Sequence, residues 1–157
     1  MSLLNIRSIE LQDVISIDEK LIKLALETGL GWRDKRNIPG LIKYGFSNNP
    51  LFKGFVAEVK SKTVGVCLYF ITFSEWEGLP TINIQDLYVD KEHRKNKIAV
   101  KLIQAVIKKE KLTCIKLMVS SSNIKAKEFY NKIGFHYRPE EQSYYIGGKE
   151  ILELENK

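Results

Sequence analysis

The sequence predicts an α/β fold of the α+β kind, in which helices cover a mixed β-sheet. Residues 81–119 have the order strand, helix, strand, which implies a right-handed crossover and parallel pairing. Residues 54–59 and 63–73 are apolar, β-branched and aromatic runs around a short polar turn, the pattern of an antiparallel hairpin. Since the chain has 157 residues and shows no repeat or linker, we expect a single domain over residues 1–157.

About six to seven strands flanked by about four helices are expected in this domain. The strand-like runs are residues 3–9, 54–59, 63–73, 82–89, 114–119, 135–137 and 144–154. The segments with apolar residues at helical spacing are residues 12–27, 38–46, 99–109 and 123–133. Gly29 and Gly31 end the first helix, Pro39 argues for a late start of the second, and Gly134 caps the fourth.

The chain is organised around residues 82–110, where a strand leads through a basic turn into an amphipathic helix. Apolar positions of the strand alternate up to Ile84 and again from Leu87, so the phase slips by one residue at Gln85 and Asp86. Side chains on a strand alternate between the two faces of a sheet, and such a slip therefore predicts a β-bulge that splays the strand.

Positive charge is concentrated where this helix begins. Residues 90–111 contain eight Lys or Arg and three Asp or Glu, so they hold a net +5 of the chain's +6. A helix N-terminus offers unpaired N–H groups and the positive end of the helix dipole, which together favour a phosphate. From this stretch alone two interpretations stay open: a cradle for a pyrophosphate, and a solvated basic turn.

Several classes of protein and of site are disfavoured by the composition. No apolar run approaches the ~20 residues that span a bilayer, and the N-terminus does not resemble a signal peptide. Cys67 and Cys114 lie in apolar runs, so we expect buried free thiols and a cytoplasmic, reducing location. The only histidines are His93 and His136, and no Cys/His spacing fits zinc; we expect no metal and no membrane partner.

Two motifs resemble the GNAT superfamily of acyl-CoA-dependent N-acetyltransferases. The first resembles its R-x-x-G-x-G/A signature and consists of Arg94, Lys95, Asn96, Lys97, Ile98 and Ala99. The second resembles its other cofactor motif and consists of Asn123, Ala126, Phe129, Tyr130, Gly134 and Phe135 in register. The preceding strand and the hairpin also match the GNAT order, so the resemblance covers nearly the whole chain.

A narrower likeness is to the diamine (spermidine/spermine) N-acetyltransferase branch. It rests on an aromatic strand at Tyr69 and Phe70, a Trp-x-Gly loop at Trp76, and residues 84–89. This resemblance implies the primary amine of a small molecule as substrate, with a diamine or polyamine as the candidate, bound by Gln85, Asp86 and Trp76.

The superfamily resemblance also implies acetyl-CoA as co-substrate, direct attack in a ternary complex, and a homodimer. The residues that it assigns to the cofactor are Leu87, Tyr88, Val89, Arg94, Lys95, Asn96, Lys97, Ile98, Ala99, Asn123, Ala126 and Tyr130. Tyr130 would protonate the departing thiolate. An alkylamine with a pKa near ~10.4 needs a base, for which Asp86 is the candidate.

Two departures from the family pattern keep other functions open. Lys97 stands where the signature has its first glycine, and Gln85 stands where the diamine branch has a glutamate that can accept a proton. The alternative to an enzyme is therefore a non-catalytic CoA-binding regulatory protein of the same fold. A nucleic-acid-binding module would use the basic stretch, but the chain lacks a recognised reading motif, so we expect no nucleic-acid partner.

Overall fold

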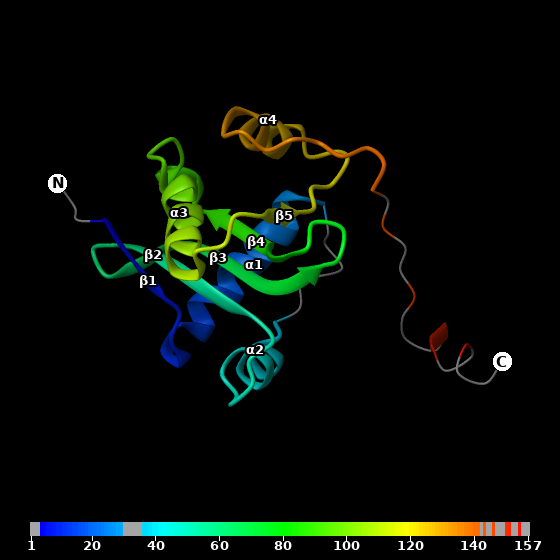
Figure 1. Cartoon of the computed structure of the whole chain (residues 1–157). Coiled ribbons are helices and arrows are strands. Elements are labelled where there is room, and N and C mark those ends of the chain that lie inside the picture. Colours follow the sequence, from blue (N-terminus) through cyan, green and yellow to red (C-terminus); the bar gives the residue numbers. More distant parts are fainter. Residues whose placement is uncertain are drawn as a thin grey trace. The chain divides into compact units, whose positions relative to one another are not determined.

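A computed structural model describes residues 4–29, 36–141, 143, 146, 150, 151 and 154 (Figure 1). The chain divides into two compact units, Met1–Asn123 and Ile124–Lys157, and each is described by itself. The expectation of a single domain over residues 1–157 stays a prediction.

The first unit contains a five-stranded mixed sheet in the order β1-β2-β3-β4-β5. Its strands are β1 Leu4–Ser8, β2 Lys53–Val59, β3 Lys62–Ser74, β4 Leu79–Val89 and β5 Ile115–Leu117. Strands β1 to β4 pair antiparallel, whereas β4 and β5 pair parallel. The α/β class, the hairpin and the parallel crossover are therefore confirmed.

Four α-helices and two short 3-10 helices have both of their ends among the described residues. They are η1 Leu11–Asp13, α1 Val14–Glu27, α2 Ile38–Gly45, η3 Lys91–His93, α3 Ile98–Glu110 and α4 Ile124–Lys132. The predicted number of α-helices is confirmed within the described residues. None of the helices in these ranges is long and apolar enough to cross a membrane.

Helices α1 and α3 cover opposite faces of the sheet (Figure 1). The core on the α1 face consists of Val14, Ile17, Leu41, Val56, Val66, Leu68 and Tyr88. On the other face Leu102 and Val106 of α3 are fully buried. Gly65 of β3 lies beneath α3, and a Cβ there would approach the Leu102 side chain at 3.4 Å and the Tyr88 carbonyl at 3.1 Å. The tighter contact is with β4 rather than with the helix, so a side chain at this position would require the backbone of β4 to shift by a few tenths of an ångström.

The predicted β-bulge is confirmed at Gln85. Leu68 of β3 pairs with Asp86, but the next residue, Tyr69, pairs with Ile84, so Gln85 is the extra residue of β4. Tyr69 faces α3, since its hydroxyl donates to Glu110 at 2.7 Å. Without the extra residue, the apolar side chains before and after this point would face opposite sides of the sheet.

The predicted closing strands are wrong where the structure describes them. Residues 135–137 form no strand, because the Phe135 N–H donates to the Tyr130 carbonyl at 3.0 Å and closes a helix end instead. Most of residues 144–154 lie outside the described residues, as does Gly31, while Glu150, Ile151 and Leu154 are helical. The described part of the chain thus has five strands rather than six to seven.

Both cysteines are free, as predicted, but only Cys67 is fully buried. Burial, together with the nearby Asp86 charge, raises the pKa of the Cys67 thiol to about 12. A thiol with so high a pKa is an unreactive core residue at neutral pH. Cys114 is half-buried directly before β5, so its predicted burial is only partly right.

We expect Leu102→Ala to lower the free energy of unfolding by about 3 kcal/mol, because it leaves a cavity between α3 and the sheet. The matched control is Leu26→Ala on the exposed face of α1, where 61% of the residue is exposed. This control should change the free energy by less than about 0.5 kcal/mol. Urea unfolding followed by circular dichroism measures both, and equal losses would contradict the assigned core.

Candidate functional site

One edge of β4 is open beyond the bulge. β5 pairs with β4 only as far as Ile84, and within the described residues no further strand pairs with that edge up to Val89. Just after β4, the Asp90 N–H donates to the Val64 carbonyl of β3 at 2.8 Å. Because backbone groups alternate along a strand, those of Leu87 and Val89 point to the open edge.

The bulge also decides which side chains flank this edge. The Tyr88 side chain faces α1, where its hydroxyl donates to Glu27 at 3.0 Å. Asp86, two residues earlier, lies on the same α1 face, while Leu87 and Val89 face α3. Gln85 itself is exposed. The predicted carboxylate and the predicted cofactor strand are therefore brought together at one point of β4.

The basic turn follows directly and ends at the first residue of α3. Lys95 and Lys97 adopt left-handed backbone conformations, with φ of 69° and 58°. The first N–H groups of α3, from Ile98 on, have no partners within the helix and carry the positive end of its dipole. Lys95, Lys97 and Lys101 are exposed and form no ion pair with the other described residues. The turn can therefore hold an anion.

Arg94, the first residue of the signature, is tied to the protein. Its Nε donates to the Val89 carbonyl at 2.8 Å, and its Nη2 donates to the Glu27 carboxylate at 2.7 Å. The guanidinium also lies over the Tyr88 ring, 5.4 Å from the ring centroid. Arg94 thus fixes the path of the chain from β4 into the turn, and it occupies the carbonyl of Val89 at the open edge.

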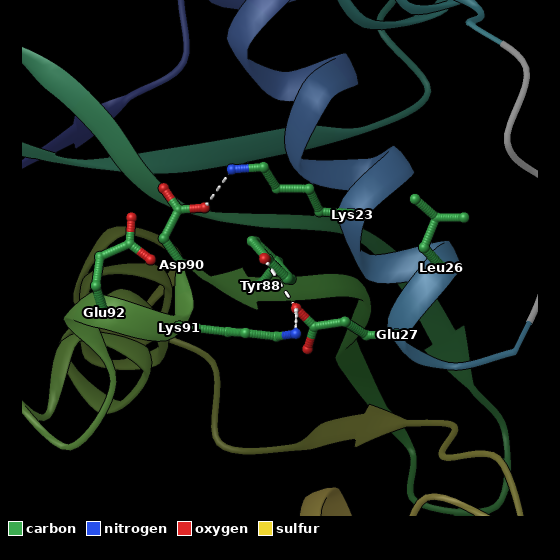
Figure 2. Close-up of a pocket in the computed structure, with 7 residues that line it drawn as sticks. All are labelled: Lys23, Leu26, Glu27, Tyr88, Asp90, Lys91 and Glu92. Atoms are coloured by element: carbon green, nitrogen blue, oxygen red, sulfur yellow. Dashed lines mark hydrogen bonds and ion pairs between the residues drawn. The ribbon is translucent and has the colours of Figure 1, made fainter.

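A pocket of about 280 Å³ lies where the last turns of α1 meet the end of β4 and η3 (Figure 2). Asp90 accepts hydrogen bonds from Lys20 at 2.6 Å and Lys23 at 3.0 Å. Burial by itself raises the pKa of Asp90, but these two hydrogen bonds outweigh burial and hold the pKa below its ordinary value. The stability that these hydrogen bonds contribute to the folded protein is present above about pH 4. It is lost as the pH falls through the lowered pKa of Asp90.

Sequence reasoning missed the α1 residues that reach this site. Lys20, Lys23 and Glu27 recur at spacings that place them on one helix face, beside the apolar face that packs on the sheet. A charged stripe bordering an apolar stripe was the available signal, but it is also typical of an ordinary solvated helix. Only the ion pairs that these three residues form with Asp90 and Arg94 distinguish this charged stripe from that of an ordinary solvated helix.

The part of the second motif that lies in the second unit, from Ala126 on, ends in a helix-capping arrangement. Gly134 has a φ of 99°, and its N–H donates to Asn131 while the Phe135 N–H donates to Tyr130. The Tyr130 and Phe135 rings pack edge to face, with their centroids 5.4 Å apart. These are the two hydrogen bonds and the apolar contact of a Schellman cap, which confirms the predicted role of Gly134. Asn123 directly precedes α4.

Trp76 lies far along the chain from the bulge. It occupies the tight connection between β3 and β4 and is 92% exposed. The strand from Leu79 to Asp86 separates it from the bulge by ~20 Å of extended chain. No group of three or more His, Cys, Asp or Glu residues that could hold a metal occurs among the residues described.

A family model described as an acetyltransferase (GNAT) domain matches residues 50–137, more than half of the chain. The match contains the bulged strand, the basic turn and the α4 motif. This chain belongs to the GNAT acetyltransferase family. Thialysine N-epsilon-acetyltransferase from Sus scrofa is 31% identical over 127 residues, which cover 72% of this chain and 74% of that protein.

Solved structures of low identity share the GNAT fold. An integron cassette protein from V. cholerae has a TM-score of 0.80 and 21% identity, with 100% of this chain and 99% of that chain covered. An aminoglycoside N-acetyltransferase in complex with CoA has a TM-score of 0.71 and 16% identity, with coverage of 95% and 97%. Identities this low support the fold alone.

Lys97 occupies the position at which the GNAT signature has a glycine. A lysine with a left-handed backbone costs about 1 kcal/mol relative to glycine, because its Cβ crowds the following carbonyl. The turn thus keeps the conformation that glycine would favour, with an added ammonium group.

We therefore expect Lys97→Gly to raise the free energy of unfolding by about 1 kcal/mol. The matched control is Lys101→Gly, one turn inside α3, which should lower it by about 1 kcal/mol because glycine weakens a helix interior. Thermal and urea unfolding give both values. The same sign of change for both variants would contradict the left-handed conformation of Lys97.

Proposed function

We propose that this protein is an acetyl-CoA-dependent N-acetyltransferase that transfers an acetyl group to the primary amine of a small molecule. The observation that carries the proposal is the open edge of β4, which leads directly into the cationic turn at the start of α3. A pantetheine arm can lie along this edge like an added strand, bonded to the backbone groups of Leu87 and to the N–H of Val89, whose carbonyl already accepts from Arg94. Its pyrophosphate then meets the N–H groups of Ile98 and Ala99, with Lys95, Asn96 and Lys97 around it.

The proposed reaction is direct attack within a ternary complex. The amine nitrogen attacks the thioester carbon, the carbon–sulfur bond breaks, and CoA leaves as a thiolate. Asp86, on the α1 face of the bulge, accepts the proton that the amine must lose. A backbone N–H at the open edge stabilises the oxyanion. Tyr130 gives a proton to the thiolate, while Asn123 and Ala126 contact the pantetheine region.

We propose a small, flexible amine as acceptor, with Gln85, Asp86 and Trp76 as its binding residues. The name of the porcine relative, thialysine N-epsilon-acetyltransferase, supports an amine at the end of an amino-acid side chain. The resemblance to the diamine branch supports a diamine or polyamine instead. We also propose a homodimer, on family resemblance, and a reducing compartment, which the free thiols of Cys67 and Cys114 support.

One observation favours a second function, that of a non-catalytic CoA-binding regulatory protein. The bulge residue is Gln85, whose carboxamide cannot accept a proton as the glutamate of the diamine branch can. If Asp86 does not replace that glutamate, the protein binds the cofactor without turnover.

Calorimetry with acetyl-CoA, followed by free-thiol release with spermidine and thialysine in the same sample, separates these functions. We expect acetyl-CoA to bind and an amine to release CoA thiol. Binding without release across a panel of diamines, polyamines and amino acids would support the regulatory protein. Failure of acetyl-CoA to bind would contradict both.

We expect Tyr130→Phe to lower kcat by about 100-fold, because the thiolate loses its proton donor while the ring contact with Phe135 is kept. The dissociation constant for CoA should change far less than kcat. Tyr137→Phe is the matched control, since Tyr137 belongs to the same unit and is 80% exposed. An unchanged kcat in Tyr130→Phe would restrict Tyr130 to its capping role.

A further inference from the structure

Three charged residues of α1 hold the chain where it passes from β4 into the basic turn. Lys20 and Lys23 bind the Asp90 carboxylate at 2.6 and 3.0 Å, and Glu27 binds Arg94 at 2.7 Å. Figure 2 shows Lys23 and Glu27 reaching from α1 toward β4 and the turn. We call Lys20, Lys23 and Glu27 the α1 clamp.

Asp90 is the residue at which strand geometry ends. Its N–H still bonds β3 at Val64, while its carbonyl accepts the His93 N–H at 2.9 Å and so begins η3. Its carboxylate is buried together with the Lys20 ammonium, the two side chains being 8% and 7% exposed. Breaking a buried pair by removing one partner leaves a buried charge without compensation, so Asp90 cannot move away from α1 without a large cost.

Glu27 holds the other end of the same segment. One carboxylate oxygen accepts a hydrogen bond from Arg94. The other oxygen accepts a hydrogen bond from the Tyr88 hydroxyl at 3.0 Å and lies 3.8 Å from the Lys91 ammonium. Arg94 in turn donates to the Val89 carbonyl. The clamp therefore fixes residues on both sides of η3, and the turn begins from a fixed position.

The turn needs such support because its backbone is strained. Lys95 and Lys97 both have positive φ without being glycine. Residues held in this region cost of order 1–3 kcal/mol each and persist only where their surroundings determine the conformation. Lys95 and Lys97 form no ion pair with the other described residues, so the turn is held at its two ends: by the buried Ile98 where α3 begins, and by Asp90 and Arg94 at its start.

We propose that the α1 clamp is a positioning device that presets the basic turn for the pyrophosphate of acetyl-CoA. This rests on the proposed function. Lys20, Lys23 and Glu27 are positioning residues: they act through Asp90 and Arg94. Loss of the clamp lets the turn move relative to the start of α3, and affinity for the pyrophosphate falls while the thioester site at the bulge is kept.

Two variants test the clamp, Asp90→Asn and Glu27→Gln. We expect each to raise the KM and the dissociation constant for acetyl-CoA about 10- to 100-fold, with a much smaller change in kcat. S-acetylpantetheine, which lacks the pyrophosphate, should keep its kcat/KM with both variants. If Asp90→Asn does not fold, Glu27→Gln still tests the clamp, since the Glu27 side chain is less buried than that of Asp90, at 25% against 8% exposed.

Matched controls separate positioning from general loss of stability. Glu110, at the far end of α3, resembles Glu27 in accepting hydrogen bonds from a tyrosine hydroxyl and a cation. Its donors are Tyr69 at 2.7 Å and Lys53 at 3.0 Å. Asp13 is a buried carboxylate bound by Arg7 at 2.7 Å. Glu110→Gln and Asp13→Asn should lower the melting temperature as the clamp variants do, yet leave the KM for acetyl-CoA unchanged.

The outcomes also separate this inference from the proposed function. If the wild-type protein binds acetyl-CoA and the clamp variants bind equally well, or if acetyl-CoA and S-acetylpantetheine are affected alike, the clamp has no positioning role. If the wild-type protein does not bind acetyl-CoA, the proposed function fails and the inference with it. If acetyl-CoA binds without turnover, the dissociation constants alone decide the role of the clamp.

Discussion

The extra residue at Gln85 is the constraint on which the rest of the site depends. The apolar side chains of β4 pack against α3 on both sides of the bulge, yet the backbone of β4 stops pairing with β5 after Ile84. Inserting one residue achieves both, since it keeps Ile84 and Leu87 on one face while β5 pairs no further than Ile84. The open edge is thus a consequence of how the core is packed, and the carboxylate of Asp86 lies beside it.

Tertiary contacts determine which charged side chains of the basic segment form ion pairs and which face solvent. The basic segment contains three acids, and two of them are bound by lysines from elsewhere in the chain. Asp90 is held by Lys20 and Lys23, and Glu110 is held by Lys53. Lys95, Lys97 and Lys101 of the segment face solvent near the start of α3. Pairing Asp90 with Lys20 and Lys23 therefore leaves free positive charge at the N-terminus of α3, whereas Glu110 is paired at the opposite end of the helix.

The α4 motif shows how one set of residues can carry both local folding and proposed chemistry. Gly134 ends the helix in a left-handed conformation, and Phe135 closes it by hydrogen bonding and ring contact with Tyr130. The same contact orients the tyrosine that we propose as proton donor. Such double use explains why the spacing of this motif is a strong signal in the sequence, even though several of its members have structural roles.

The sequence by itself determined the elements whose signals are local. Alternation predicted the bulge, helical spacing predicted α1 and α3, and Gly134 predicted a cap, because each depends on residues a few positions apart. The tertiary structure alone decided that Lys20 pairs with Asp90, 70 residues away, and that residues 135–137 close a helix rather than a sheet. It also decided that Lys97 has the backbone of a glycine. These features depend on which strands and helices become neighbours, and no local pattern encodes that.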